Sequence, residues 1–496
     1  MSDNGTKPGA DTSKMTAASD HKRSRGALMF TEGPIPYLMR RMAVPMLMGL
    51  AAMIVASLAD TYFLAKLGTT HLAAITFTFP VVMLLSNLTI GIGSGFSSLL
   101  ARALGEGAGD KVQKLTMSAM LLSSLAVLFL SLIGYFTIDP LFTALGAGPE
   151  ALVLIREYMS IWYLAIVFIV VPMTGNFALR ASGNPGAASS VMIISAIVNI
   201  IIDPILIFGF LFIPEMGMKG AAIAGVISRG VSFAATFYIL GVRNKLIARR
   251  LPPLDEILDA WRDILRIGGP LAMTNMIVPV SAAFITYLLA QFGEETVAGF
   301  GVAARIEALA AIPLMAVGSS ISPIVGQNFG ATRYGRVAET MKTGFMFFIF
   351  YGLFASVVLA LGRNAIPAFF DPNPEVIKTA SLYLVIVPIG YVAMGLSMVV
   401  GASYTGMGNP RPSVVMSLGR MVVVYIPLAY IGSKFFGPAG IFAAGTAANY
   451  IVGIAAFYFA LWQGRKAISA GHLQPADIDF RHSQLARRLG LKETKE

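Results

Sequence analysis

The 496-residue chain contains no cysteine, so it forms no disulfide and offers no thiolate nucleophile or cysteine-based metal site. Charge is also scarce: Asp, Glu, Lys and Arg make up 13% of the chain, against roughly 25% in soluble domains. The sequence contains no Walker A motif, so it gives no support for ATP-driven activity. The first 25 residues lack the apolar core of a cleavable signal peptide. We expect them to form a solvated tail.

Hydrophobic residues make up 56% of the chain and are gathered into twelve long stretches. About 20 apolar residues are enough for a helix to cross the ~30 Å hydrocarbon core of a bilayer. The pattern therefore predicts an all-α integral membrane protein with twelve transmembrane helices. Their expected cores are residues 42–66, 72–100, 115–136, 155–178, 186–208, 218–241, 267–290, 297–325, 340–361, 377–401, 412–434 and 438–463.

The net charge of +11 reflects membrane topology and does not indicate nucleic-acid binding. If the amino terminus is cytoplasmic, 28 Lys and Arg residues fall on the inner side of the membrane and five on the outer side. This asymmetry is the positive-inside pattern. It predicts a multi-pass protein of the cytoplasmic (inner) membrane with both termini in the cytoplasm.

The chain repeats itself at a constant spacing of 225 residues. Pro45 corresponds to Pro270, Gly68 to Gly293, and the Gly-Asn-Pro stretch at 183–185 to that at 408–410. Because each repeat holds six spans, both repeats begin on the same side of the membrane. We therefore expect two six-helix bundles related by a pseudo-two-fold axis along the membrane normal, a plan that transporters use to bind substrate between their halves. A single chain already contains both halves, so a monomer suffices for such a mechanism.

The repeat also sets the expected domain boundaries. We expect a disordered cytoplasmic tail at 1–33, an amino lobe at 34–241, a cytoplasmic linker at 242–266, a carboxy lobe at 267–463 and a basic cytoplasmic tail at 464–496.

Three acidic residues interrupt the apolar stretches, and each lies where the two repeats differ. Asp60 corresponds to Ile285 and Glu307 to Val82. The position equivalent to Asp203 in the second repeat is also occupied by a hydrocarbon residue. An acid at mid-membrane costs roughly 2.5–3.5 kcal/mol on the insertion scale, and such residues face a cavity or the bundle interior. They are therefore candidate functional residues.

Asp60 and Asp203 are expected to share one site. Each lies about 26 Å from the inner end of its helix at ~1.5 Å per residue. Asn199 lies one turn before Asp203 and on the same face. Such a group can hold a proton, because desolvation disfavours the charged acid, or can surround Na⁺ with oxygen ligands. For Glu307, a coupling or substrate role and simple neutralisation by a partner such as Arg420 both remain open.

These residues resemble the multidrug and toxic compound extrusion (MATE) transporters, most closely their prokaryotic DinF-like branch. The resemblance covers about residues 34–463. It rests on Pro45 fifteen residues before Asp60, on the paired Gly-Asn-Pro turns, and on three motifs: NIIIDP (199–204), RIE (305–307) and PIVGQNFGA (323–331).

The resemblance implies export of cationic or amphipathic organic compounds in exchange for inward H⁺ or Na⁺, with no cofactor. It places a cation site at Asp60, Asn199 and Asp203, and a helix bend near Pro45. Family members commonly add a hydroxyl residue after a GAAIA-like stretch. Here that position is Gly225, which favours H⁺ over Na⁺.

Two other functions remain as alternatives. A flippase for lipids or lipid-linked oligosaccharides uses a similar helix plan, but tends to carry more cationic residues in its cavity. An intramembrane aspartyl enzyme could use Asp60 and Asp203 for acid–base work. The expected Tyr-Asp and Gly-x-Gly-Asp surroundings are missing from this sequence, which makes the enzyme the remote alternative.

Overall fold

The structure, a computed structural model, describes residues 30–210, 213–248 and 250–474. These residues are almost entirely helical, with a single isolated β-bridge between Phe210 and Ile213. Ten helices are long and apolar enough to cross a membrane, and the pair α6 (Pro149–Leu164) and α7 (Ile166–Ala181), bent by 54°, forms an eleventh span.

The twelfth span lies within α17 (Ile426–Ser469), which contains a kink at Gly437, where φ is 58° and ψ is −143°. Gly432 and Gly440 on the two sides of this kink contact each other through their backbones. A straight helix of 44 residues would extend ~66 Å, about twice the hydrocarbon thickness. The kink therefore divides α17 between two spans, and the expected twelve are present.

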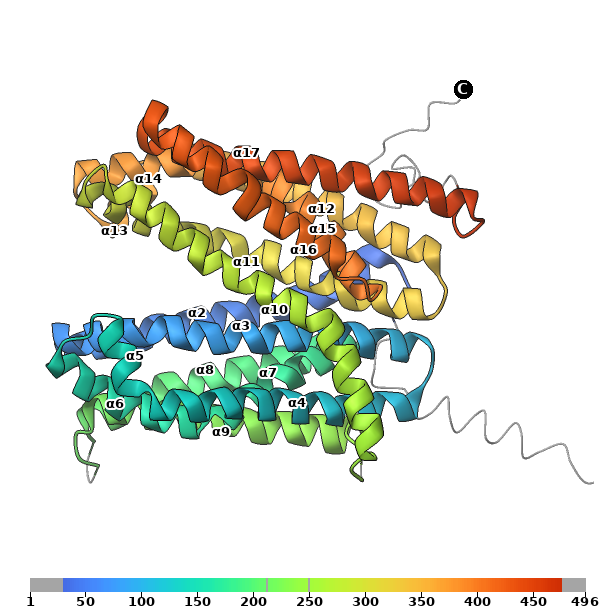
Figure 1. Cartoon of the computed structure of the whole chain (residues 1–496), viewed down its shortest axis with the longest axis horizontal. Helices are drawn as coiled ribbons and strands as arrows, with labels where there is room; N and C mark the ends of the chain where they lie inside the picture. The colour runs from blue at the N-terminus through green and yellow to red at the C-terminus, as the bar shows by residue number, and fades with distance from the viewer. Residues whose placement is uncertain (1–29, 211–212, 249, 475–496) are drawn as a thin grey trace, which may run out of the picture.

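The helices form two lobes that lie side by side, one blue to green and the other yellow to red in Figure 1. Besides α6 and α7, the amino lobe holds α2 (Ile35–Lys66), α3 (Thr69–Gly105), α4 (Gly109–Phe136), α5 (Ile138–Ala144), α8 (Pro185–Phe208), α9 (Gly217–Tyr238) and the π-helical turn η1 (Ile239–Arg243). Besides α17, the carboxy lobe holds α10 (Leu254–Ala290), α11 (Glu294–Gly330), α12 (Tyr334–Leu361), α13 (Ala365–Phe370), α14 (Pro374–Ile386), η2 (Pro388–Gly390), α15 (Tyr391–Gly406), α16 (Arg411–Leu418) and the π-helical η3 (Gly419–Tyr425).

The 225-residue repeat is visible in the backbone. The same left-handed turns recur in both lobes, mostly at glycine, which adopts positive φ without a steric penalty. Threonine takes the glycine's place at one of them. The equivalent φ angles are 123° at Gly68 and 108° at Gly293, 74° at Gly107 and 58° at Thr332, and 78° at Gly183 and 86° at Gly408.

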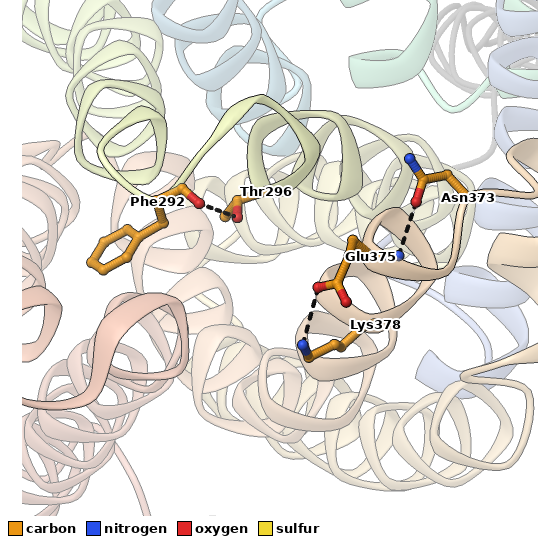
Figure 2. Close-up of polar contacts among 5 residues, drawn as sticks. All are labelled: Phe292, Thr296, Asn373, Glu375 and Lys378. Carbon is orange, nitrogen blue, oxygen red and sulfur yellow. Dashed lines mark hydrogen bonds and ion pairs between the residues drawn. The ribbon is translucent and has the colours of Figure 1, made fainter.

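Helix starts in the carboxy lobe are fixed by local polar contacts (Figure 2). The Asn373 side chain accepts a 3.0 Å hydrogen bond from the Glu375 backbone N–H and so caps α14, and Lys378 pairs with Glu375 at 3.0 Å. Near the start of α11, the Thr296 hydroxyl donates to the Phe292 carbonyl at 3.2 Å. The Asn373 and Thr296 hydrogen bonds each satisfy a backbone group near a helix end.

The first helix of each repeat packs partly against the other lobe, which changes the expected boundaries. The first half of α2, including Met39 and Met42, belongs to the same buried core as the carboxy-lobe helices. In the other direction, Trp261 near the start of α10 donates a 2.8 Å hydrogen bond to the Ser118 carbonyl of α4. The expected linker 242–266 is thus partly helical. Only residues 244–253 connect the helices, and the rest of that range is helical.

The start of the described chain is also packed, although we assigned residues 1–33 to a disordered tail. Phe30 is fully buried. Its backbone N–H donates to the Gln327 side chain at 2.8 Å, and Arg336 donates to its carbonyl at 3.0 Å. The expected tail therefore extends too far by at least four residues, and residues 1–29 lie outside the described residues. At the other end, α17 continues to Ser469, and residues 475–496 are likewise outside the described part of the chain.

The two lobes meet at the end of the molecule where α2 begins and α17 ends, which we call the tail end. There α3 crosses α11. Backbone contacts are close: a Cβ on Gly105 would lie 2.1 Å from the Gln327 carbonyl oxygen, and one on Gly330 would lie 2.3 Å from that of Arg102. These two contacts are equivalent under the 225-residue repeat. Away from this crossing the lobes diverge toward the opposite, far end (Figure 1).

Candidate transport cavity and ion site

A cavity of about 1050 Å³ lies between the lobes and is lined by residues from both. Eight methionines and twelve serines contribute to its wall. Thioether side chains adapt to ligands of different shapes, and hydroxyl groups both donate and accept hydrogen bonds. The wall therefore suits partly polar organic molecules. The cavity volume lies at the upper end of the ~300–1,000 Å³ range of small-molecule pockets.

The charges on the cavity wall are mainly positive. Arg180, Arg229 and Arg420 line the cavity, and Asp60 is the one acidic residue among the described residues that do so. The Arg180 guanidinium lies 4.4 Å from the centre of the Phe177 ring. Two of these arginines come from the amino lobe and one from the carboxy lobe, so an anion at the centre could contact both lobes.

Arg420 stands on an irregular turn. It lies in the π-helical segment η3, and its guanidinium donates a 3.1 Å hydrogen bond to the Asn449 side chain. π-helical turns are rare and frequently occur at functional sites. The bond to Asn449 fixes the direction of the guanidinium. The remaining guanidinium N–H groups are donors that a ligand in the cavity could use.

The structure brings together the three residues expected to form the ion site. Asp60 comes from α2, while Asn199 and Asp203 lie one turn apart on α8. The Asn199 amide donates to Asp203 Oδ1 at 3.0 Å. The Asp60 and Asp203 side chains interact with each other, and the charge of Arg229 acts on Asp203 as well. Asp60 and Asn199 face the cavity.

Asp203 lies behind this polar wall and is only 1% exposed. Its second oxygen, Oδ2, has no hydrogen-bond donor among the described residues. A neighbouring ionised carboxylate such as Asp60 only accepts hydrogen bonds, so the contact between the two acids becomes a hydrogen bond only when one of them carries a proton. The arrangement therefore offers a place for a cation or a proton between two acids.

Position 225 adds no side-chain oxygen to this site. Gly225 offers no hydroxyl, and a Cβ built on it would lie 2.6 Å from Arg229 Nη1. The nearby Ser228 hydroxyl donates to the Gly225 carbonyl at 3.0 Å. A guanidinium thus fills the place where the family resemblance puts an oxygen ligand.

Glu307 lies apart from this ion site. It stands on α11 in the carboxy lobe, accepts a hydrogen bond from the Tyr383 hydroxyl, and is not among the residues that line the cavity. Arg420, which we considered as its neutralising partner, instead bonds Asn449. A phenol therefore donates to this half-buried acid. Its coupling or substrate role stays a prediction.

The expected bend near Pro45 also stays a prediction. α2 runs as one continuous helix through this residue. Proline has no N–H to donate to the carbonyl one turn earlier, so the helix is weakened locally at this point. The next residue, Met46, lines the cavity, which makes this turn of α2 part of the wall.

Sequence reasoning missed the arginine set. Arg229 and Arg420 interrupt apolar stretches, and an intramembrane charge is a functional signal by default. Arg180 lies in the last turn of α7, which the topology count assigned to the inner side. Its part in the cavity depends on where α7 packs, which no local pattern reveals.

Two helical lobes around a central cavity define a multi-pass membrane transporter built from a repeat. Comparisons with known proteins agree. The MatE family model matches residues 45–205 and matches again at residues 270–431, one match in each lobe. The chain therefore belongs to the MATE family, as its motifs predicted.

Two relatives and one solved structure illustrate the similarity. The chain is 34% identical over 427 residues to a protein of Shewanella oneidensis named FAD transporter, covering 86% of this chain and 94% of the relative. It is 25% identical over 419 residues to the multidrug export protein MepA of Staphylococcus aureus, covering 83% and 90%. The crystal structure of the Vibrio cholerae MATE transporter VcmN in the bent form superposes with a TM-score of 0.82 at 26% identity, covering 89% and 99%.

Proposed function

We propose that this chain is a secondary antiporter of the cytoplasmic (inner) membrane that exports large amphipathic organic anions, dinucleotides among them, in exchange for an inward-moving H⁺ or Na⁺. The observation that carries the proposal is the charge of the cavity wall, with three arginines and one acid. Guanidinium groups bind phosphate and carboxylate oxygens through paired, charge-assisted hydrogen bonds. A cationic substrate would meet net repulsion on this wall.

Size and similarity support the same substrate class. The 1050 Å³ cavity lies at the upper end of the volume range of small-molecule pockets, as a large ligand requires. A relative that is 34% identical over most of both chains bears the name FAD transporter, and FAD is an aromatic dinucleotide with a diphosphate. The lining charge therefore favours anionic compounds over the cationic ones that the family resemblance implied, while amphipathic character fits both.

Alternating access follows from the arrangement of the lobes. The positive-inside pattern places the tail end in the cytoplasm. Since the lobes close there and diverge toward the far end, this arrangement would be the outward-facing state of the proposed cycle. Substrate would enter when the α3–α11 crossing opens, and would leave when the lobes rock back to the present arrangement.

The energetics suit an anion. With the inside negative, an entering proton and a leaving negative charge both move with the membrane potential. Each charge is driven by ~2.3 kcal/mol per 100 mV. For a cationic substrate exchanged against one proton the two electrical contributions cancel. An anion exporter therefore needs fewer coupling ions for the same gradient.

Proteoliposomes that hold the purified full chain test the proposal. Export of FAD and of ethidium is measured under separately imposed pH, Na⁺ and voltage gradients. We expect ion-driven FAD transport. Arg180→Gln or Arg420→Gln should lower it at least ~10-fold, since each removes a charge-assisted hydrogen bond of ~1.5–3 kcal/mol. The matched control is Arg363→Gln, a change at an exposed arginine outside the cavity, which should leave transport unchanged.

The same vesicles separate the alternatives. Transport of ethidium without FAD would contradict the anion proposal and restore the cationic substrate class. A lipid flippase is the second candidate, because the three cavity arginines would also suit an anionic headgroup. Translocation of a fluorescent anionic phospholipid in the absence of FAD transport would favour that function.

A further inference from the structure

The amino-lobe ion site carries its own positive charge. Family resemblance implies that Na⁺ can bind between Asp60, Asn199 and Asp203, with a further hydroxyl ligand from the α9 helix. In this chain the corresponding position is Gly225, and Arg229 Nη1 lies 2.6 Å from the point where its Cβ would stand. A guanidinium therefore occupies the space that a threonine side chain would need.

Helix geometry explains this placement. Residues four apart lie on the same face of an α-helix, and long side chains lean back toward its amino terminus. Arg229 therefore extends over the turn that contains Gly225, and any residue with a side chain there would push it away. Because Gly225 has no side chain, the Arg229 guanidinium has room to lie over it.

The guanidinium is held close to the acids without being locked to them. Its charge acts on Asp203 and on Tyr158 of α6. Among the described residues it forms no ion pair within 4 Å, and it also lines the cavity. Asp203 Oδ2 still lacks a donor. Arg229 is thus a tethered cation with an unsatisfied acceptor in its neighbourhood.

The site has one oxygen ligand fewer than the family resemblance implies, because position 225 is a glycine. Asp203 Oδ1 also accepts from Asn199. A hard cation requires several oxygens at once. A fixed positive charge beside the site would also repel it.

We propose that Arg229 is a tethered cation that takes the place of Na⁺ in the amino-lobe site, so that this site does not bind Na⁺. The inference rests on the proposed antiport only where it concerns coupling: the inward-moving ion in the exchange is then not Na⁺. Ion binding by the purified protein is independent of which substrate is exported.

Thermal unfolding of the purified full chain tests this inference. Unfolding is followed in 100 mM NaCl, KCl or choline chloride, together with ²²Na⁺ binding. We expect the natural chain to unfold at the same temperature in all three salts and to show no saturable ²²Na⁺ binding. The double variant Gly225→Thr with Arg229→Ala should gain saturable ²²Na⁺ binding. It should also gain a Na⁺-specific stabilisation on the order of 2 °C.

Two further variants keep the test decisive. Arg229→Lys keeps the positive charge and should stay insensitive to Na⁺, whereas Arg229→Gln should show weak Na⁺ binding even if the double variant fails to fold. Saturable Na⁺ binding to the natural chain that Asp203→Asn abolishes would overturn the inference. So would a folded double variant and a folded Arg229→Gln that both ignore Na⁺. Failure of FAD transport would leave all of these outcomes unchanged, so the two proposals can fail separately.

Discussion

Gly105 of α3 and Gln327 of α11 meet where the lobes close, with the place of a Gly105 Cβ only 2.1 Å from the Gln327 carbonyl oxygen. The equivalent contact in the 225-residue repeat joins Gly330 and Arg102. The place of a Gly330 Cβ lies 2.3 Å from the Arg102 carbonyl oxygen. Two crossing helices approach this closely only where small residues remove the side chains between them. The closed tail end therefore depends on two equivalent glycines.

A methyl group at this crossing should force the tail end apart. We expect Gly105→Ala or Gly330→Ala to destabilise the closed arrangement by ~1–3 kcal/mol, because a backbone carbonyl cannot move aside as a flexible side chain can. Since the chain has no cysteine, Ser98→Cys provides a single reporter at this crossing, where Ser98 is fully buried. A hydrophilic maleimide should label it at least several-fold faster in the alanine variants.

The matched control for this labelling is Gly109→Ala. Gly109 lies in the same region of the chain but has no atom within 4 Å of its would-be Cβ, so labelling should stay at the natural rate. Equal labelling in all variants would show that the crossing is not the closing contact.

Asp203→Asn should abolish ion-driven transport and leave a folded protein. The amide is nearly isosteric and can still accept from Asn199, but it can neither lose a proton nor supply a negative charge. We expect at least a ~10-fold loss of ion-driven export in proteoliposomes, with substrate binding retained.

Glu307→Gln is the informative comparison for Asp203→Asn. Glu307 bonds Tyr383 and lies outside the cavity lining, so its amide should keep more than about half of the transport rate. Full export by the Asp203 variant, or loss only in the Glu307 variant, would move the ion site from the amino lobe to the carboxy lobe.

Gln327 should also hold the start of the described chain in place. Its amide accepts from the Phe30 N–H and donates to the Ala181 carbonyl, both at 2.8 Å. We expect Gln327→Ala to leave these two buried groups unpaired, at ~1–3 kcal/mol each. Hydrogen exchange of the segment 30–34, followed by mass spectrometry, should then become at least ~10-fold faster.

Lys111→Ala serves as the control for Gln327→Ala. It removes an exposed ion pair with Glu106 at the same end of the molecule, and exposed pairs contribute little to stability. If the alanine at position 327 leaves exchange unchanged, other contacts hold this segment. The bonds from Arg336 to the Phe30 and Gly33 carbonyls would be the next to test.

Periodic features of the sequence predicted much of the fold. The apolar stretches predicted twelve spans, and the turns at Gly183 and Gly408 predicted that the two lobes share one plan. The helices proved longer than the apolar cores at the tail end, as in α11, which continues to Gly330. Polar residues there follow the helix out of the hydrocarbon, so hydropathy underestimates helix length.

The ion-site residues were also accessible to sequence reasoning, because an acid inside an apolar stretch is costly. Asn199 and Asp203 share a helix face through local geometry alone. Their proximity to Asp60 was predicted from equal depth in the membrane, counted in residues from the inner end of each helix. Arg229 lies four residues after Gly225, so their contact was also open to local reasoning. Nothing local indicated that Arg180 would face the same cavity as Arg420.

What the sequence determined by itself is whatever repeats or interrupts a pattern along the chain: the number of spans, the two-fold plan and the acids that break it. Only the tertiary structure decided which charges face one another, because that depends on how helices far apart in sequence rotate and pack. That packing places parts of α2 and α10 against the opposite lobe. It also brings the three arginines to the cavity wall. Whether a side chain is buried between helices depends on both packed surfaces. A local stretch of sequence describes only one of them.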